Sequence, residues 1–220
     1  TLDALILTHP DEDHIGGALP VLQEIRVKRL LTNGFDAVTL TARQVRGLAV
    51  AKGIHEEPLA AGMRVTGMDG LEAIVLHPPA GFVPGTRPSS NDNSLVLKVS
   101  RGAVSLLLCG DLEEAGLPWM LAWDRQLRST VLKVPHHGSA LGFHAPSFFE
   151  QVDPTLALIS VGRLHHLPAP STLRDLRATG ADLLLTREAG AITIRTDGRR
   201  VVVQTFREPG SREAKIVKKG

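Results

Sequence analysis

The chain has 220 residues, 43% of them hydrophobic and 22% charged, which is the composition of a folded globular protein and the length of a single domain. The 25 Lys and Arg residues nearly balance the 23 Asp and Glu residues, so no large positive field is available to hold nucleic acid non-specifically. The single cysteine, Cys109, excludes an internal disulfide framework and a cysteine-rich zinc module, so any metal ligands must be histidines and carboxylates.

Hydrophobic spacing and turn residues predict alternating strands and helices in the first part of the chain. We expect strands at residues 4–7, 25–31, 62–66 and 73–76, helices at residues 15–24 and 41–51, and a loop rich in proline, glycine and serine at residues 78–90. The first strand starts almost at residue 1 with no earlier strand to pair with. We therefore expect that the chain has been cut from a longer protein.

The rest of the chain is richer in strands. A hairpin is predicted at residues 94–109, helices at residues 113–127 and 171–179, and further strands at residues 131–134, 156–161, 182–185, 191–196 and 200–206. Hairpins and crossovers alternate irregularly, which favours a layered α/β sandwich over a doubly wound sheet. We expect one domain over residues 1–206, followed by a basic C-terminal tail over residues 207–220 that is frayed from residue 211.

Four possible metal ligands lie within six positions at the end of the first predicted strand. They are His9, Asp11, Asp13 and His14. Imidazole and carboxylate groups suit divalent ions such as Zn²⁺ or Mn²⁺, and alternate residues can face one ion while the adjacent pair faces a second. The alternative is an acidic loop in which Asp13 caps the next helix. A cap needs only one of these residues, so we favour the metal site.

Asp111 ends a wholly apolar predicted strand, and the preceding glycine allows the backbone to approach closely. Two cations ~3.5–4 Å apart repel each other unless an anion lies between them, and a carboxylate together with a hydroxide can supply it. Taken alone, Asp111 is better explained by a turn or a helix cap. Together with the first motif, it is predicted to bridge two metal ions.

A second pair of histidines, His136 and His137, follows another apolar strand. Either imidazole can be a ligand while the other orients a phosphate or protonates a leaving group. Gly138 and Ser139 offer backbone and hydroxyl donors to an anion. The alternative is a pair of surface histidines, and the sequence leaves open which histidine has which role.

Two further segments contain weaker candidates. Asn93 and Ser94 belong to a polar run that a simple turn explains equally well. His165 and His166 can supply a late ligand, although loop histidines are more often solvated. The remaining histidines, His55, His77 and His144, are assigned to structure or surface.

The first motif resembles the metallo-β-lactamase signature His-x-His-x-Asp-His, with its second histidine replaced by Asp11. The order of the later motifs is similar to the C-terminal domain of the ComEC family of competence DNA-uptake channels, from residue 1 to about residue 196. These motifs are His77-Pro-Pro, Asn91-Asp-Asn-Ser-Leu-Val-Leu97, Leu108-Cys-Gly-Asp111, Leu132-Lys-Val-Pro-His-His-Gly-Ser139 and Ile159-Ser-Val-Gly162.

The resemblance implies an αββα sandwich that lacks its first strands, and a site with two divalent metal ions. By position, His9 and Asp11 would hold one ion and Asp13 and His14 the other, Asp111 would bridge them, and His136 or His137 would complete the site. Asn93 and Ser94 would stand where the wider superfamily has its middle histidine. Exchanging a histidine for Asp11 makes the ligand set harder, which favours Mn²⁺ over Zn²⁺.

The chain departs from the family pattern in two places. The segment at residues 162–168 is shorter than its family counterpart, so a late ligand has moved to His166 or has been lost. The upstream strand that carries the family's Asp-x-Gly motif is absent, in line with the expected truncation.

The predicted reaction is phosphodiester hydrolysis, in which a metal-bridging hydroxide attacks phosphorus in line. Asp13, Asp111, His137 and Ser139 are the predicted catalytic residues, and Asn93, Ser94, Ser139 and His166 the predicted substrate contacts. The alternatives are a hydrolase of a small ester or lactone and a domain that binds DNA without cutting it.

The resemblance also implies a cellular setting. Single-stranded DNA would be the substrate, specifically the strand that is not imported, and the channel domain of the same longer polypeptide would be the partner. No run in this chain approaches the ~18 apolar residues of a membrane-spanning helix. The chain would therefore be a soluble part of a membrane protein, on the outer side of the cell membrane.

Overall fold

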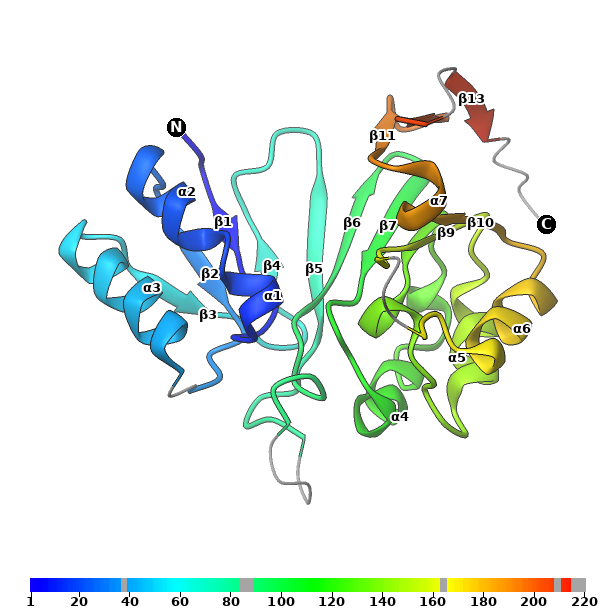
Figure 1. Cartoon of the computed structure of the whole chain (residues 1–220), viewed down its shortest axis with the longest axis horizontal. Coiled ribbons are helices and arrows are strands. Elements are labelled where there is room, and N and C mark those ends of the chain that lie inside the picture. The colour runs from blue at the N-terminus through cyan, green and yellow to red at the C-terminus, as the bar shows by residue number, and fades with distance from the viewer. Residues whose placement is uncertain (37–38, 84–88, 163–165, 208–210, 215–220) are drawn as a thin grey trace.

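The fold is built from two facing sheets, each covered by helices on its outer side (Figure 1). The computed structural model describes residues 1–36, 39–83, 89–162, 166–207 and 211–214. The first sheet is parallel, in the order β1-β2-β3: β1 (Leu5–Ile6), β2 (Leu30–Thr32) and β3 (Glu56–Pro58). Three helices accompany it: α1 (Glu12–Ile15), α2 (Ala18–Glu24) and α3 (Leu40–Ala51).

The second sheet has seven strands in the order β10-β9-β8-β7-β6-β5-β4. Its strands are β4 (Arg64–Val65), β5 (Glu72–His77), β6 (Val96–Arg101), β7 (Val104–Leu108), β8 (Val131–Lys133), β9 (Leu156–Ile159) and β10 (Asp182–Leu185). Pairing is antiparallel from β4 to β7 and parallel from β7 to β10. Helices α4 (Leu117–Leu121), α5 (Ala145–Val152) and α6 (Pro170–Ala178) lie on its outer side, and α7 (Thr186–Ala189) follows β10.

Separate apolar clusters fill the spaces between these layers. Leu22, Leu30 and Val45 belong to the cluster between the first sheet and its helices. Leu31, Val75 and Leu97 belong to the cluster between the two sheets. Phe148, Phe149 and Leu107 belong to the cluster under the outer helices of the second sheet. The order of layers is therefore αββα, as predicted.

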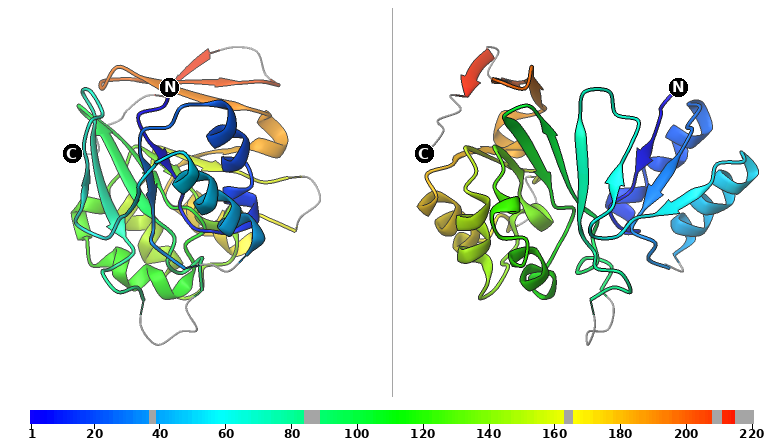
Figure 2. Two further views of the ribbon diagram at one scale, coloured as in Figure 1. Left: turned by 90° about the vertical axis from the view of Figure 1, so that its left-hand side faces the viewer. Right: turned by 180° about the vertical axis from the view of Figure 1, so that it is seen from behind.

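A third sheet closes the end of the molecule away from the predicted ligands. It is antiparallel and consists of β11 (Ile192–Thr196), β12 (Val201–Thr205) and β13 (Ser211–Ala214), and Figure 2 shows it lying across the top of the second sheet. Ala103 N donates to Gly198 O at 2.8 Å, which joins the β11–β12 turn to the β6–β7 turn. Part of the expected frayed tail is thus a strand, because its backbone pairs with β12. The domain boundary at residue 206 remains a prediction.

Several helical segments also differ from their predictions. The helix expected at residues 15–24 is divided at Gly16-Gly17 into α1 and α2. The helix expected at residues 113–127 is interrupted, since Asp124 has a positive φ of 46°, and forms η1 (Glu114–Gly116), α4 and η2 (Asp124–Leu127). Helix α5 was not predicted, although its buried residues have the i, i+3, i+4, i+7 spacing of a helix: Ala145, Phe148, Phe149 and Val152.

The topology brings the predicted ligands together at one edge of the sandwich. Strands β7, β8 and β9 are parallel, so their carboxyl ends share one edge. The end of β1 reaches the same edge from the other sheet, where Leu95 N donates to Thr8 O at 2.7 Å. No helix in the described part of the chain is long and apolar enough to cross a membrane.

Candidate metal centre

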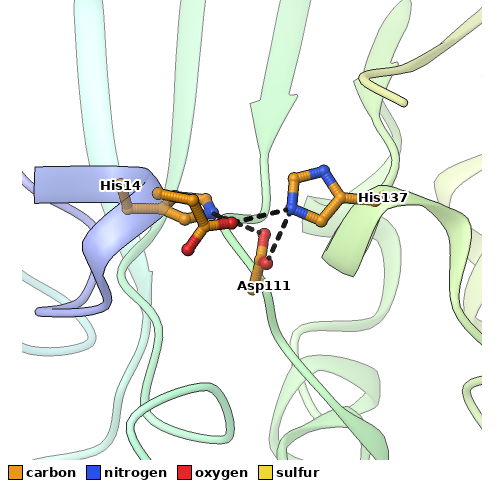
Figure 3. A group of neighbouring side chains, drawn as sticks. His14, Asp111 and His137 are labelled. Carbon is orange, nitrogen blue, oxygen red and sulfur yellow. Dashed lines mark hydrogen bonds and ion pairs between the residues drawn. The ribbon is translucent and has the colours of Figure 1, made fainter. Parts of the chain in front are cut away.

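Asp13, His14, Asp111 and His137 form a compact cluster at this edge. Each offers one ligand atom, and these four atoms all lie within 4.8 Å of one another. They come from α1, from the loop after β7 and from the turn η3 (Pro135–Gly138) after β8. Figure 3 shows His14 and His137 pointing toward Asp111 from opposite sides. His14 Nε2 lies 3.1 Å from Asp111 Oδ1, and His137 Nε2 lies 3.2 Å from Asp111 Oδ2.

Asp111 is the buried centre of the cluster, with only 4% of its side chain exposed. Burial by itself would raise the pKa of Asp111, but the contacts with His137 and His14 and the nearby ammonium of Lys133 hold it well below its usual range. The carboxylate is therefore ionised at neutral pH. An ionised, buried carboxylate at the meeting point of two imidazoles is well suited to ligate a cation.

Four buried atoms of the predicted ligands at this edge have no hydrogen bond of good geometry. One is His136 Nδ1, which faces Glu113, and the other three are His9 Nε2, His14 Nε2 and Asp111 Oδ1. Leaving polar atoms buried and unpaired costs about 1–3 kcal/mol each, so such atoms need another partner. Divalent cations would satisfy the latter three, and the residues present therefore fit the metals that the sequence predicts.

The turn η3 separates the roles of the two adjacent histidines. His136 and His137 both have positive φ, 42° and 54°, which residues other than glycine seldom adopt. His137 Nδ1 donates to Ser160 O at 2.7 Å, which leaves Nε2 facing Asp111 and Asp13. The Asp111 contact raises the pKa of His137 to about 9 in the absence of metal.

His136 turns toward a different carboxylate. Its Nδ1 lies 2.9 Å from Glu113 Oε1, and its Nε2 is 3.9 Å from Asp111 Oδ2. Of the two histidines that the sequence could not distinguish, His137 thus belongs to the cluster and His136 lies at its border.

His9 and Asp11 lie beside the cluster rather than in it. The His9 side chain is 1% exposed, and its Nε2 is 3.9 Å from Asp11 Oδ2. The His9 ring lies 4.1 Å from the His14 ring, centroid to centroid. Burial lowers the pKa of His9 to about 4, so the ring is neutral at physiological pH and able to ligate. This pair thus has an imidazole and a carboxylate of the kind that ligate divalent ions, and the second ion remains a prediction.

Asn93 and Ser94 were predicted to contact substrate, and the structure does not support that role because both side chains are fully buried. Asn93 Oδ1 accepts a hydrogen bond from Val83 N at 2.8 Å. Ser94 Oγ accepts one from Asp111 N at 3.1 Å and lies 3.3 Å from His9 Nδ1. Ser94 thus contacts two of the predicted ligands, whereas the Asn93 side chain bonds the backbone of the preceding loop.

The roles predicted for Ser139 and His166 remain predictions. Ser139 is partly buried, and its carbonyl accepts a hydrogen bond from Thr172 Oγ1 at 2.6 Å. His166 is exposed. Within the described residues, no hydrogen bond joins the Ser139 hydroxyl or His166 to the cluster. His165 falls outside the described residues.

Lys133 belongs to the surroundings of the cluster and was not predicted from the sequence. Its Nζ donates to Gly110 O at 3.0 Å and lies 3.6 Å from Asp111 Oδ1. The signal was present, because a lysine inside the apolar run at residues 131–134 needs a reason to be there. Its ammonium adds positive charge next to the predicted metal ions.

A cleft opens beside the cluster and gives it access to solvent. Its volume is about 380 Å³, and it is lined by Asp13, His137, Ser160, Val161, Gly162, Leu167 and Thr186. Because Asp13 and His137 belong to this lining, a molecule in the cleft would touch the ligand cluster directly.

Comparison with known sequences identifies the family. The sequence model of the metallo-β-lactamase superfamily matches residues 1–179. The chain belongs to this superfamily. The fold and the ligand cluster together support a metal-dependent hydrolase with divalent ions as cofactors.

Curated relatives include several competence proteins, which confirms the resemblance to the ComEC family. The chain is 37% identical over 207 residues to ComE operon protein 3 of Bacillus subtilis, an alignment covering 90% of this chain and 25% of that protein. It is 30% identical over 196 residues to competence protein ComA of Neisseria gonorrhoeae, covering 87% of this chain and 25% of ComA. The chain thus spans about a quarter of the length of these relatives.

Solved structures support the fold. Igni18, a metallo hydrolase of the archaeon Ignicoccus hospitalis, matches with a TM-score of 0.52 at 16% identity, over 93% of this chain and 80% of Igni18. CmlA, a diiron β-hydroxylase of Streptomyces venezuelae, matches with a TM-score of 0.53 at 14% identity, over 82% of this chain and 43% of CmlA.

Proposed function

We propose that this chain is a metal-dependent phosphodiesterase that cuts DNA. The observation that carries the proposal is the cluster of Asp13, His14, Asp111 and His137, in which two buried ligand atoms lack hydrogen-bond partners. Asp13, His14 and His137 would hold one ion, His9 and Asp11 the other, and Asp111 would contact both. The mixture of carboxylate and imidazole ligands favours Mn²⁺, with Zn²⁺ as the alternative.

Two bound cations would lower the pKa of a water molecule toward ~7 and stabilise the charge that develops at phosphorus. The chain's own residues orient the ligands and receive the substrate. Ser160 O fixes the His137 ring, and the cleft beside Asp13 and His137 gives a phosphodiester room to approach. His136, which is oriented by Glu113, is the residue available to hold a proton for the leaving oxygen.

The charge of the site favours an anionic substrate. The six predicted ligands include three carboxylates, Asp11, Asp13 and Asp111, whose charge two divalent ions would more than cancel. The ammonium of Lys133, 3.6 Å from Asp111 Oδ1, adds a further positive charge. A phosphodiester anion would be attracted to such a site, whereas a neutral ester or lactone would gain little from it.

The similarity to competence proteins supports DNA as the source of that phosphodiester. We propose single-stranded DNA as the substrate, specifically the strand that is not imported, and the channel part of a longer polypeptide as the partner. The domain would then work at the outer side of the cell membrane.

The test is to measure metal content by elemental analysis and cleavage of labelled single-stranded DNA with added Mn²⁺. The wild-type chain is compared with Asp111→Ala and with Asp69→Ala, since Asp69 is exposed and outside the cluster. We expect metal-dependent cleavage that is lost in Asp111→Ala and retained in Asp69→Ala. Bound metal with hydrolysis of a p-nitrophenyl ester and no DNA cleavage would instead support a small-molecule hydrolase. A chain that binds DNA but no metal would be a binding domain.

A further inference from the structure

One hydroxyl group lies between the two histidines of the first motif. Thr8 Oγ1 is 3.1 Å from His9 Nδ1 and 3.3 Å from His14 Nδ1. The rings are 4.1 Å apart between centroids and tilted by 46°, so both present the same nitrogen to the same oxygen. In the sequence, Thr8 directly follows the strand expected at residues 4–7 and is not among the predicted site residues.

The position of Thr8 is set by both sheets. The preceding residue, Leu7, donates from its backbone N to Leu31 O in the first sheet at 2.9 Å, and Thr8 O accepts from Leu95 N just before β6 of the second sheet. Gly110 packs against Thr8 closely: a side-chain carbon at Gly110 would come within 3.0 Å of Thr8 Cβ. The hydroxyl is therefore held at the junction of the two sheets.

The two Nδ1 atoms beside Thr8 would need a hydrogen-bond acceptor if both histidines bound metal through Nε2. A neutral imidazole that binds a metal through Nε2 carries its hydrogen on Nδ1, and that hydrogen needs an acceptor. His9 Nε2 and His14 Nε2 are both buried without a hydrogen bond of good geometry, although His14 Nε2 lies 3.1 Å from Asp111 Oδ1, so both nitrogens are available to a metal. A hydroxyl oxygen has two lone pairs, so Thr8 Oγ1 can accept from both Nδ1–H groups at once.

We infer that Thr8 is a positioning residue that orients His9 and His14 together, with Nε2 of each ring turned toward the metal centre. The inference rests on the proposed metal site. It also predicts an asymmetry between the rings, because Ser94 Oγ lies 3.3 Å from His9 Nδ1 and gives that ring a second hydroxyl partner. The described contacts give His14 Nδ1 only Thr8, so loss of this hydroxyl should disturb His14 more than His9.

The test compares wild type with Thr8→Val, which keeps the shape but removes the hydroxyl, and with Thr8→Ser, which keeps the hydroxyl. Binding of Zn²⁺ and of Mn²⁺ is measured by calorimetry, and the Nδ1–H signals of the zinc-loaded proteins by ¹⁵N NMR. Loss of such a supporting contact typically weakens metal affinity by about 10–100-fold, and we expect this for Thr8→Val. Thr8→Ser should stay within about threefold of wild type, because it restores the acceptor. The His14 Nδ1–H should be protected from exchange in wild type and in Thr8→Ser but not in Thr8→Val.

Circular dichroism and the melting temperature of the metal-free proteins show whether each variant is folded. A folded Thr8→Val that binds metal as tightly as wild type would overturn the inference and leave the metal site standing. Equal losses in Thr8→Ser and Thr8→Val would also overturn it, because the methyl group rather than the hydroxyl would then be responsible. If wild type binds no metal, the metal site fails as well, so the two failures are distinguishable.

Discussion

His137 Nε2 lies 3.2 Å from Asp111 Oδ2, and these two residues follow neighbouring parallel strands, β8 and β7. The next residue back, His136, has its Nε2 3.9 Å from the same oxygen and its Nδ1 against Glu113. These two sequence neighbours thus have different surroundings in the fold, so their replacement should affect metal binding differently.

Replacing His137 should impair metal binding much more than replacing His136. His137→Ala removes an atom of the cluster, whereas His136→Ala removes a side chain at its border. We expect His137→Ala to weaken Mn²⁺ binding by at least about tenfold and His136→Ala to change it by less than about threefold. Calorimetric titration of both variants gives the comparison. Equal losses would show that both imidazoles are ligands.

Stability should fall in mild acid because of His77. This side chain is fully buried, and burial lowers its pKa to about 4 from an ordinary value of 6.5. Because the folded pKa is the lower one, the neutral ring contributes its full stability above pH 6.5, and that contribution is lost as the pH falls toward 4.

A shift of this size corresponds to about 3 kcal/mol of unfolding free energy between pH 7 and pH 4. His77→Gln keeps a hydrogen-bonding side chain that does not titrate. Urea unfolding of metal-free wild type and His77→Gln gives the free energy of unfolding at each pH. Plotted against pH, the values for the two proteins should converge in acid. Parallel curves across this range would contradict the assignment.

Cys109 should be inert in the folded protein. Its side chain is fully buried, and burial raises the pKa of the thiol to about 12, so almost no reactive thiolate forms at neutral pH. Alkylation by iodoacetamide, followed by mass spectrometry, should be slow in buffer and rapid in urea. Val50→Cys is a suitable positive control, since Val50 is 78% exposed and its replacement thiol should react at once. Rapid labelling of Cys109 without urea would mean that the core opens readily.

Truncating two phenylalanines, one just before α5 and one within it, should change the free energy of unfolding by very different amounts. Phe149 is fully buried in the cluster under the outer helices, whereas Phe143 is 85% exposed. Phe149→Ala should lower the free energy of unfolding by about 3–5 kcal/mol, because it removes packed atoms and leaves a cavity. Phe143→Ala should change it by no more than about 0.5 kcal/mol. Urea unfolding of the metal-free proteins measures both, and a large loss in Phe143→Ala would reveal a packing contact for that ring.

Much of the site was accessible from residue types and their positions. Short apolar runs predicted buried strands, and a polar segment follows each run. His9, Asp111 and His137 lie in these polar segments, so they were expected at strand ends. The turn at residues 9–14 has more imidazole and carboxylate groups than the capping of a helix requires, which favoured a metal site. The irregular alternation of hairpins and crossovers also favoured a layered α/β sandwich over a doubly wound sheet.

Other features depended on how the two sheets pack. The separation of His137 from His136 comes from backbone torsions in η3 that no spacing rule predicts. Asn93 and Ser94 are buried because the polar run before β6 passes beneath the end of β1, a contact between residues about 85 positions apart. The backbone oxygen of Thr8 accepts from Leu95 N in the other sheet, and Lys133 meets Asp111 because β8 pairs with β7, contacts that exist only after folding. The chemistry of a residue can be recognised from the sequence alone. The burial of its side chain and the direction in which the side chain points depend on contacts between distant segments.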